Sequence, residues 1–270
     1  MKLKFIAVIL LLISFCFLGN AQSTASKNVL TFTLESPQLD ANKKIWVYLP
    51  SDYKETKKTY PVLYLQDAQN LFDKSTSYSG EWRIDETLDS LKLELIVIGI
   101  EHGNEKRIDE LTPFPHPEHK GGNAEHYLKF ITETLKPEID KRFRTKVEVS
   151  NTFIGGSSLG GLFSYFAVLK HPETFGKAIV FSPSFWFSEK IAGLTDEISA
   201  EKLDQTKFYF RAGKKESETM VPLMCEIKQK LLSKGLKSDQ VNFKTLSDGQ
   251  HNEAFWSGLF PQAALWLLEN

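Results

Sequence analysis

The stretch IGGSSLGG, residues 154–161, decides how this sequence folds. The pattern G-x-S-x-G fits it in one register only, because Ser158 has Gly156 two residues before it and Gly160 two residues after it. A strand-like run, VSNTFIG, precedes the motif, and an amphipathic run typical of a helix, GGLFSYFAVLKH, follows it. This strand, turn and helix is the setting in which a serine nucleophile is found at a sharp turn. Ser158, rather than Ser157, is therefore the candidate nucleophile.

A serine at such a turn projects its hydroxyl above the end of the strand, and the flanking glycines let strand and helix approach without a clash. The start of the helix also places the backbone amide of Leu159 where negative charge would develop on a reacting carbonyl oxygen. The motif alone is weak evidence, because three such positions match by chance in about one chain in ten of this length. The alternative interpretation is a glycine-rich turn with an idle serine.

A serine hydroxyl needs a base to accept its proton, and in this setting an acid and then a histidine follow the serine in chain order. His251 lies in LSDGQHNEAFW, between the last predicted strand and the last predicted helix. The acid is expected on the loop after the preceding strand, where KFYFRAGKKESE offers Glu216. Glu218 and Asp248 remain as alternatives, and Glu216 itself is also interpretable as a solvated loop carboxylate.

Outward from the motif, short apolar runs alternate with amphipathic stretches along the chain. After Tyr60 each predicted strand is followed by a predicted helix, whereas the first two runs, VLTFTL and KIWVYL, are joined by a short turn. This order predicts an α/β fold with a mostly parallel sheet, helices on both faces and an antiparallel start. The predicted helices cover 82–90, 124–143, 159–171, 220–234 and 252–268. Two irregular segments, 101–122 and 184–206, interrupt the alternation, and such segments are often functional.

The first residues carry the pattern of a secretory signal peptide. Lys2 and Lys4 precede an unbroken apolar stretch over 5–18, and small residues follow as far as Ala21. We expect a signal peptide over 1–21, a flexible leader over 22–28 and a single domain over 29–270, in a protein that is secreted or periplasmic. An uncleaved anchor is the alternative, although the apolar stretch is shorter than the roughly twenty residues that span a bilayer.

The charges nearly balance, with 33 basic and 34 acidic residues and a formal net charge of −1. With both signs interspersed, this composition indicates neither nucleic acid nor a membrane surface as a partner. Cys225 is the one cysteine after the signal peptide, so no internal disulfide is expected. No cofactor and no metal are expected, because the proline-broken loop with His116 and His119 does not predict two imidazoles on one face. The oligomeric state stays open.

An oxyanion hole needs a second backbone amide, normally from a loop after an earlier central strand. The run YPVLYLQDAQNLFD predicts a strand that ends at Asp67 and is followed by Ala68 and Gln69. The amide of Ala68 or of Gln69 is therefore the candidate second donor. The side chain of Asp67 is expected to organise the loop rather than to take part in the chemistry.

The chain resembles the esterase family of α/β-hydrolases that includes feruloyl, acetyl xylan and enterochelin-type esterases. The stretches YPVLYLQDAQNLFD, GEWRIDETLD, RIDELTPF, FIGGSSLGGLFSYFAVLKHPETFGKAIVFSPSFW and GQHNEAFW carry the resemblance, which extends over nearly all of the chain after residue 21. It implies that Ser158 is the nucleophile, His251 the base and Glu216 the acid. It also implies an oxyanion hole made by the Leu159 amide and one from Ala68 or Gln69. Ala68 departs from the family pattern, which often has glycine there.

Together these features predict an exported serine esterase that acts through an acyl-enzyme on a small-molecule or carbohydrate ester. A carbohydrate-linked acetyl or feruloyl ester is favoured, because aromatic side chains in the irregular segments can stack on a sugar or phenolic ring. Phe185 and Trp186 are the candidate pocket residues, with core packing as the alternative, more strongly for Trp186. A siderophore ester, acyl transfer and a non-catalytic binding module are the other hypotheses.

Overall fold

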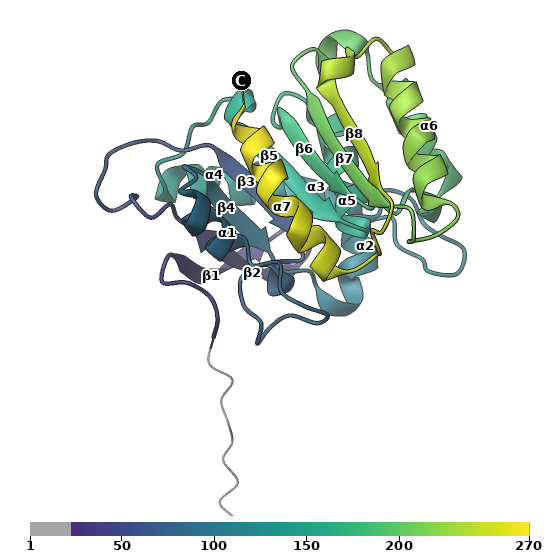
Figure 1. Ribbon diagram of the computed structural model, residues 1–270. Coiled ribbons are helices and arrows are strands. Elements are labelled where there is room, and N and C mark those ends of the chain that lie inside the picture. The colour runs from purple at the N-terminus through teal and green to yellow at the C-terminus, as the bar shows by residue number, and fades with distance from the viewer. Residues whose placement is uncertain (1–22, 270) are drawn as a thin grey trace, which may run out of the picture.

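The computed structural model describes residues 23–269, in which eight strands form one sheet (Figure 1). The order across the sheet is β1-β2-β4-β3-β5-β6-β7-β8. The strands are β1 (Val29–Ser36), β2 (Ala41–Tyr48), β3 (Val62–Gln66), β4 (Ile96–Ile100), β5 (Thr152–Ser157), β6 (Lys177–Phe181), β7 (Lys207–Gly213) and β8 (Val241–Leu246). β2 pairs antiparallel with both β1 and β4, and all other neighbours are parallel. The predicted α/β class with an antiparallel start is confirmed.

The central strands are buried on both faces, as their sequences require. Every residue of β3, β4 and β6 is buried, and these strands read as nearly continuous apolar runs, VLYLQ, IVIGI and KAIVF. A parallel sheet needs helices on both faces to cover such strands. The edge strand β1 instead has mostly exposed or half-buried residues.

Two apolar layers enclose the sheet. On one face, α1 (Ile84–Leu91) and α7 (Glu253–Leu268) pack around a core that includes Leu88, Phe181 and Phe260. The other face is covered by the remaining helices (Figure 1). These are α2 (Arg107–Leu111), α3 (Ala124–Lys129), α4 (Lys136–Arg142), α5 (Leu159–Lys170) and α6 (Met220–Ser233). The carboxyl ends of β3 and of β5 to β8 meet at one edge of the sheet, where ligands bind in open α/β folds.

The helix predicted over 124–143 forms as α3 and α4 with a π-helical segment, Phe130–Leu135, between them. Pro137 lies in the first turn of α4 and has no N–H to donate to the turn before it. The π-helical segment therefore occurs just before Pro137, where the α-helical hydrogen bonds cannot continue. The irregular segment 184–206 consists of short 3₁₀ turns, Phe185–Phe187, Glu189–Glu197 and Ala200–Leu203.

The chain before β1 lies against the domain from residue 23 onward. The Oγ of Ser23 donates a hydrogen bond to Asp73, and the amide of Ser26 donates one to Asp85. Asn28 donates to Asp89 at 3.0 Å. The part of the predicted leader that the structure describes is thus held by carboxylates, a feature that its Ser/Thr-rich composition does not predict. The predicted signal peptide lies outside the described residues, and within residues 23–269 no helix is long and apolar enough to span a membrane.

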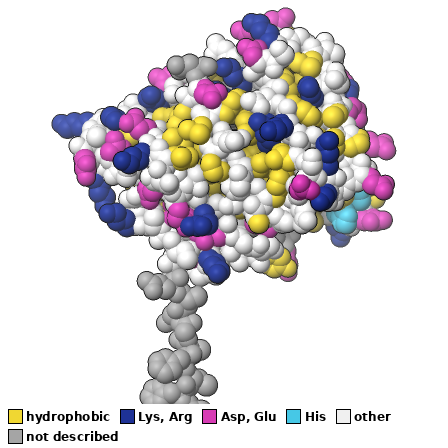
Figure 2. Space-filling view, in the orientation of Figure 1, with side chains coloured by type: hydrophobic (Ala, Val, Ile, Leu, Met, Phe, Trp, Pro, Cys, Tyr) yellow, Lys and Arg dark blue, Asp and Glu magenta, His cyan; other side chains and the backbone are white. Residues whose placement is uncertain are grey.

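Acidic and basic side chains are interspersed on the surface, as the balanced composition indicates. Figure 2 shows both signs scattered over one face of the molecule, with apolar side chains between them.

Candidate active site

Ser158 lies on a sharp turn between β5 and α5. Its backbone has φ 57° and ψ −121°, a conformation that is strained for a residue with a side chain. The turn is held by a hydrogen bond from the Ser158 amide to the carbonyl of Phe181 at 3.0 Å. A Cβ at Gly156 would lie 2.8 Å from the backbone carbon of Gly160, so that only glycine allows this approach. The G-x-S-x-G spacing therefore follows from the geometry of the turn.

The structure brings Ser158, His251 and Glu216 into one chain of hydrogen bonds. The Oγ of Ser158 lies 3.0 Å from Nε2 of His251, and Nδ1 of the same ring lies 2.8 Å from Oε2 of Glu216. A carboxylate can only accept, so Nδ1 carries the proton and Nε2 is left to accept from the serine. The ring of His251 also packs edge-on against Trp256, with centroids 4.9 Å apart.

Glu216 is fixed by donors on its second oxygen. Oε1 accepts a hydrogen bond from Ser182 Oγ at 2.8 Å and another from the amide of Gly213, the last residue of β7. Ser182 in turn accepts a bond from Nε1 of Trp256 at 2.8 Å. The Glu216 side chain is 1% exposed although its loop is charged. It is a buried and oriented carboxylate, not a solvated one.

The two rival acids lie elsewhere. The side chain of Asp248 is 86% exposed and forms an ion pair with Lys215 at 2.7 Å. Glu218 is exposed on the same loop as Glu216. The contact with His251 is made by Glu216.

A second serine, which the sequence did not single out, touches Ser158. The Oγ of Ser184 lies 3.2 Å from the Oγ of Ser158, and the Ser184 amide donates to the Ser158 carbonyl at 3.0 Å. Ser184 is buried at the end of β6. Because the hydroxyl of Ser158 has one proton to give to His251, we assign the donor role in this contact to Ser184.

We expect Ser184→Ala to lower kcat/KM by about tenfold or less, because it removes one neutral hydrogen bond to the hydroxyl of Ser158, worth about 0.5–1.5 kcal/mol. Steady-state hydrolysis of a p-nitrophenyl ester measures this. A loss as large as that of a Ser158 variant would instead give Ser184 an essential role in the reaction.

The loop after β3 lies beside the start of α5. Asp67 has a left-handed backbone, with φ 60° and ψ 47°, and a 3₁₀ turn, Ala68–Asn70, follows it. A Cβ at Gly160 would lie 3.0 Å from the Cβ of Gln66, the last residue of β3, and 3.4 Å from Oδ2 of Asp67, so the loop and the helix are in contact. The amides of Ala68, Gln69 and Leu159 belong to the first turns of their helices, where N–H groups have no acceptor within the helix. These are the three amides that the sequence indicates as oxyanion donors.

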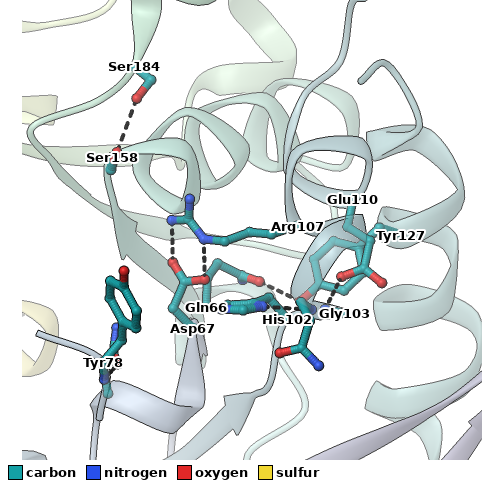
Figure 3. Close-up of polar contacts among 12 residues, drawn as sticks. Gln66, Asp67, Tyr78, His102, Gly103, Arg107, Glu110, Tyr127, Ser158 and Ser184 are labelled. Carbon is teal, nitrogen blue, oxygen red and sulfur yellow. Dashed lines mark hydrogen bonds and ion pairs between the residues drawn. The ribbon is translucent and has the colours of Figure 1, made fainter. Parts of the chain in front are cut away.

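Arg107, the first residue of α2, holds this loop. Its Nε and Nη2 donate to the two carboxylate oxygens of Asp67 at 2.7 and 2.8 Å (Figure 3). Burial alone would raise the pKa of Asp67, but the charge and the hydrogen bonds of Arg107 outweigh it and lower the pKa. Gln66, the last residue of β3, accepts a bond from the Tyr127 hydroxyl at 2.7 Å. Asp67 thus organises the loop, and Arg107 is its partner.

Asp67→Asn is expected to lower kcat by about ten- to a hundredfold with a smaller change in KM. The substitution leaves the charge of Arg107 uncompensated and loosens a loop that carries two of the candidate oxyanion amides. Lys136→Gln, which breaks the remote Lys136–Asp140 pair, is the matched control and should leave kcat unchanged.

The low pKa of Asp67 also has a pH signature. The carboxylate stabilises the fold above its ordinary pKa, and this stability is lost as the pH falls through the lowered value. Compared with the wild type, Asp67→Asn should therefore lose less of its thermal stability on acidification below about pH 4. Equal acid sensitivity of the two proteins would contradict this assignment.

The candidate pocket aromatics lie in different environments. Phe185 is 4% exposed and packs against the ring of Tyr165, with centroids 5.2 Å apart. Trp186 is 46% exposed and forms edge-on ring contacts with His116 and His119. Core packing was the stronger alternative for Trp186, but the structure shows it for Phe185, whereas the ring of Trp186 is half-exposed.

His116 and His119 are arranged differently from what the sequence predicts. A short hairpin pairs residue 116 with residue 120, and the rings of His116 and His119 stack with centroids 4.7 Å apart. The prediction that this loop does not hold two imidazoles on one face is wrong. The hairpin brings both rings to Trp186, which follows Ser184 by two residues, and so builds an aromatic surface.

A surface pocket of about 770 Å³ lies away from Ser158. It is lined by residues such as Val149, Lys170 and Glu197, and Lys170 is the last residue of α5. Ser158 precedes the first residue of that helix, so the hollow lies at the opposite end of α5 from the serine.

Comparison with known proteins relates this chain to esterases. Residues 36–267 match the family model described as "Putative esterase". The uncharacterized protein YbbA of Bacillus subtilis is 30% identical over 240 residues, 84% of this chain and 92% of YbbA. The ferri-bacillibactin esterase BesA of the same organism is 32% identical over 155 residues, 51% of this chain and 52% of BesA.

A 155-residue match at 29% identity covers 54% of this chain and 20% of an endo-1,4-beta-xylanase/feruloyl esterase of Xylanibacter ruminicola. A solved ferulic acid esterase superposes with a TM-score of 0.69 at 19% identity, covering 88% of this chain and 97% of that one. The structural likeness shows the shared α/β-hydrolase fold, and the matched span of sequence shows the family. The chain belongs to the esterase family of α/β-hydrolases.

Proposed function

We propose that this protein is a serine carboxylester hydrolase that works through an acyl-enzyme. The observation that carries the proposal is the unbroken chain from Ser158 Oγ through His251 to the buried carboxylate of Glu216, built on a strained turn at the carboxyl edge of the sheet. Backbone strain at a serine that contacts a histidine is expected where the serine hydroxyl must be presented to a substrate.

The geometry gives each group one role. The Oγ of Ser158 attacks the ester carbonyl while Nε2 of His251 takes its proton, and Glu216 stabilises the imidazolium that forms. The amides of Leu159 and of Ala68 or Gln69 hold the oxyanion. The imidazolium then protonates the leaving alcohol as the C–O bond breaks. Water, deprotonated by His251, attacks the acyl-enzyme and releases the acid and free Ser158.

For the substrate we propose a carbohydrate-linked ester with a feruloyl acyl group. The half-exposed ring of Trp186, next to His116 and His119, offers a flat aromatic surface two residues along the chain from Ser184, and such a surface suits a phenolic ring better than an acetyl group. The similarity to an endo-1,4-beta-xylanase/feruloyl esterase supports the same class.

A siderophore ester is the second candidate substrate. The similarity to the ferri-bacillibactin esterase BesA supports it, and the same aromatic surface would accept a catechol ring.

We also propose that the protein is exported, on the support of the basic and apolar pattern over residues 1–21. Expression of the full chain with sequencing of the N-terminus of the product tests this. A chain that starts near residue 22 would support removal of a signal peptide, and a chain that starts at Met1 would contradict it.

A panel of methyl ferulate, a feruloylated arabinoside, acetyl xylan and a catecholate siderophore ester tests the substrate class. We expect the highest kcat/KM on the feruloylated arabinoside. Activity confined to the siderophore ester would replace the proposed substrate and keep the serine mechanism. Failure to hydrolyse any ester or to react with a fluorophosphonate would reject the mechanism itself. Analysis of products with added acceptor sugars distinguishes hydrolysis from acyl transfer.

A further inference from the structure

Three carboxylates gather at the start of α1, apart from the residues of the candidate active site. One oxygen of each of Glu81, Asp85 and Glu86 lies within 4.8 Å of one oxygen of each of the others. Asp85 is fully buried, with 0% of its surface exposed. A cluster of acidic residues is common on protein surfaces, but a buried member is not, because a buried charge must be compensated.

Each of the three carboxylates has a donor on one of its oxygens. The amide of Ser26 donates to Oδ2 of Asp85 at 2.6 Å, and Nε of Arg83 donates to Oε1 of Glu86 at 3.2 Å. Thr24 Oγ1 donates to Oε1 of Glu81 at 3.0 Å. Donors on one oxygen of a carboxylate fix the direction of the other oxygen, as the surroundings of metal-binding carboxylates do.

The second oxygens of two of these carboxylates are not satisfied. Oδ1 of Asp85 and Oε2 of Glu86 are both buried and have no hydrogen-bond partner among residues 23–269. An unpaired buried acceptor costs about 1–3 kcal/mol, and more when it is charged. Neighbouring carboxylates with no donor between them require a positive species, either a proton or a cation.

We propose that Glu81, Asp85 and Glu86 bind a calcium ion. Every available ligand is a carboxylate oxygen, the type that hard cations prefer, and the cluster contains no imidazole or thiol. With Ca–O distances of about 2.3–2.6 Å, two ligands of one ion lie up to about 5 Å apart, which covers the spacing within the cluster. Mg²⁺, with ligands at about 2.0–2.1 Å in a strict octahedron, fits this spread less well.

A bound ion would also hold the stretch of chain before β1. Thr24 and Ser26, the donors to Glu81 and Asp85, belong to the stretch before β1. The cation would hold the two carboxylates in the positions in which they accept from these donors. Calcium binding is therefore expected to stabilise the attachment of residues 23–26 to α1 and to leave the ester chemistry unchanged.

A proton competes with the cation for this position. Burial, and then the neighbouring Glu86, raises the pKa of Asp85 to about 7, against a backbone hydrogen bond from Ser26 that lowers it. A proton shared within the cluster is therefore the alternative to a bound cation, and the calcium titration decides between the two.

The test is calorimetric titration of the EDTA-treated protein with CaCl₂, together with its Tm. At a Ca²⁺ concentration a hundred times the dissociation constant, we expect Tm to rise by roughly 5–10 °C, with a much smaller rise in MgCl₂. No heat of binding and no rise in Tm up to about 10 mM Ca²⁺, above the range of weak extracellular sites, would overturn the proposal and leave a shared proton in the cluster.

Variants locate the site. Asp85→Asn should abolish the Ca²⁺-dependent rise in Tm, and Glu81→Gln, at a half-buried position that tolerates the change, should weaken calcium affinity at least about tenfold by removing one ligand. Glu94→Gln, which breaks an exposed pair with Lys58, is the control and should respond to Ca²⁺ as the wild type does. If Glu81→Gln binds Ca²⁺ as tightly as this control, the cluster is not the site. Esterase activity is measured in parallel, so that failure of calcium binding and failure of the proposed esterase function remain separate results.

Discussion

Ser158→Ala is expected to lower kcat by at least about a thousandfold, within the range seen when a member of a catalytic triad is removed. The substitution deletes the atom proposed to attack the carbonyl, while the hydrogen bond between His251 and Glu216 stays in place. Residual activity would come from the oxyanion amides and from binding. The variant should also lose its reaction with a fluorophosphonate, because the label forms its bond with the Oγ of Ser158.

Ser157→Ala is the matched control for that experiment. Ser157 is buried at the end of β5 and pairs with Phe181 in the register of the sheet. The hydrogen bond to His251 belongs to Ser158. Ser157→Ala should keep most of the wild-type kcat and should still react with a fluorophosphonate. Comparable losses in the two variants would show that the motif has been placed in the wrong register.

The fold was predictable because its signals are local. Apolar runs of five to eight residues form strands wherever both faces are covered, and β3, β4 and β6 are such runs. The turn at Ser158 was predictable for a similar reason. Gly156 is required by a contact within five residues of chain, with the backbone of Gly160, and such a contact leaves a fixed spacing in the sequence. Gly160 is instead kept small by Gln66, which is distant in the sequence.

The supports of the site were less predictable because their partners are distant in the sequence. Arg107 binds Asp67 across 40 residues, and Ser184 reaches Ser158 across 26. Both Arg107 and Ser184 belong to the irregular segments, where no periodicity indicates which way a side chain points. The aromatic surface of Trp186 with His116 and His119 joins the two irregular segments and was missed for the same reason. The one available signal was the length of those segments, which indicated function without indicating geometry.

Glu216→Gln is expected to lower kcat by about a thousand- to ten-thousandfold without a large change in Tm. The amide of Gly213 donates to Oε1 of Glu216, so a glutamine must turn its oxygen toward Gly213 and its NH₂ group toward His251. The NH₂ group is a donor, and Nδ1 of His251 would then have to accept. The ring proton moves to Nε2, which can no longer take the proton of Ser158.

The rival acids provide the controls for this variant. Glu218→Gln and Asp248→Asn change exposed carboxylates near the same loop, so each should keep nearly the full kcat and only alter the local charge. The pH profile of kcat/KM distinguishes a wrongly oriented His251 from the mere loss of a nearby negative charge. Loss of a distant charge would shift the profile slightly at unchanged height, whereas the wrong tautomer lowers the whole profile. If Asp248→Asn lost its activity and Glu216→Gln kept it, the catalytic acid would be Asp248, which follows the carboxyl end of β8. His251 would then have to turn away from the position that the structure gives it.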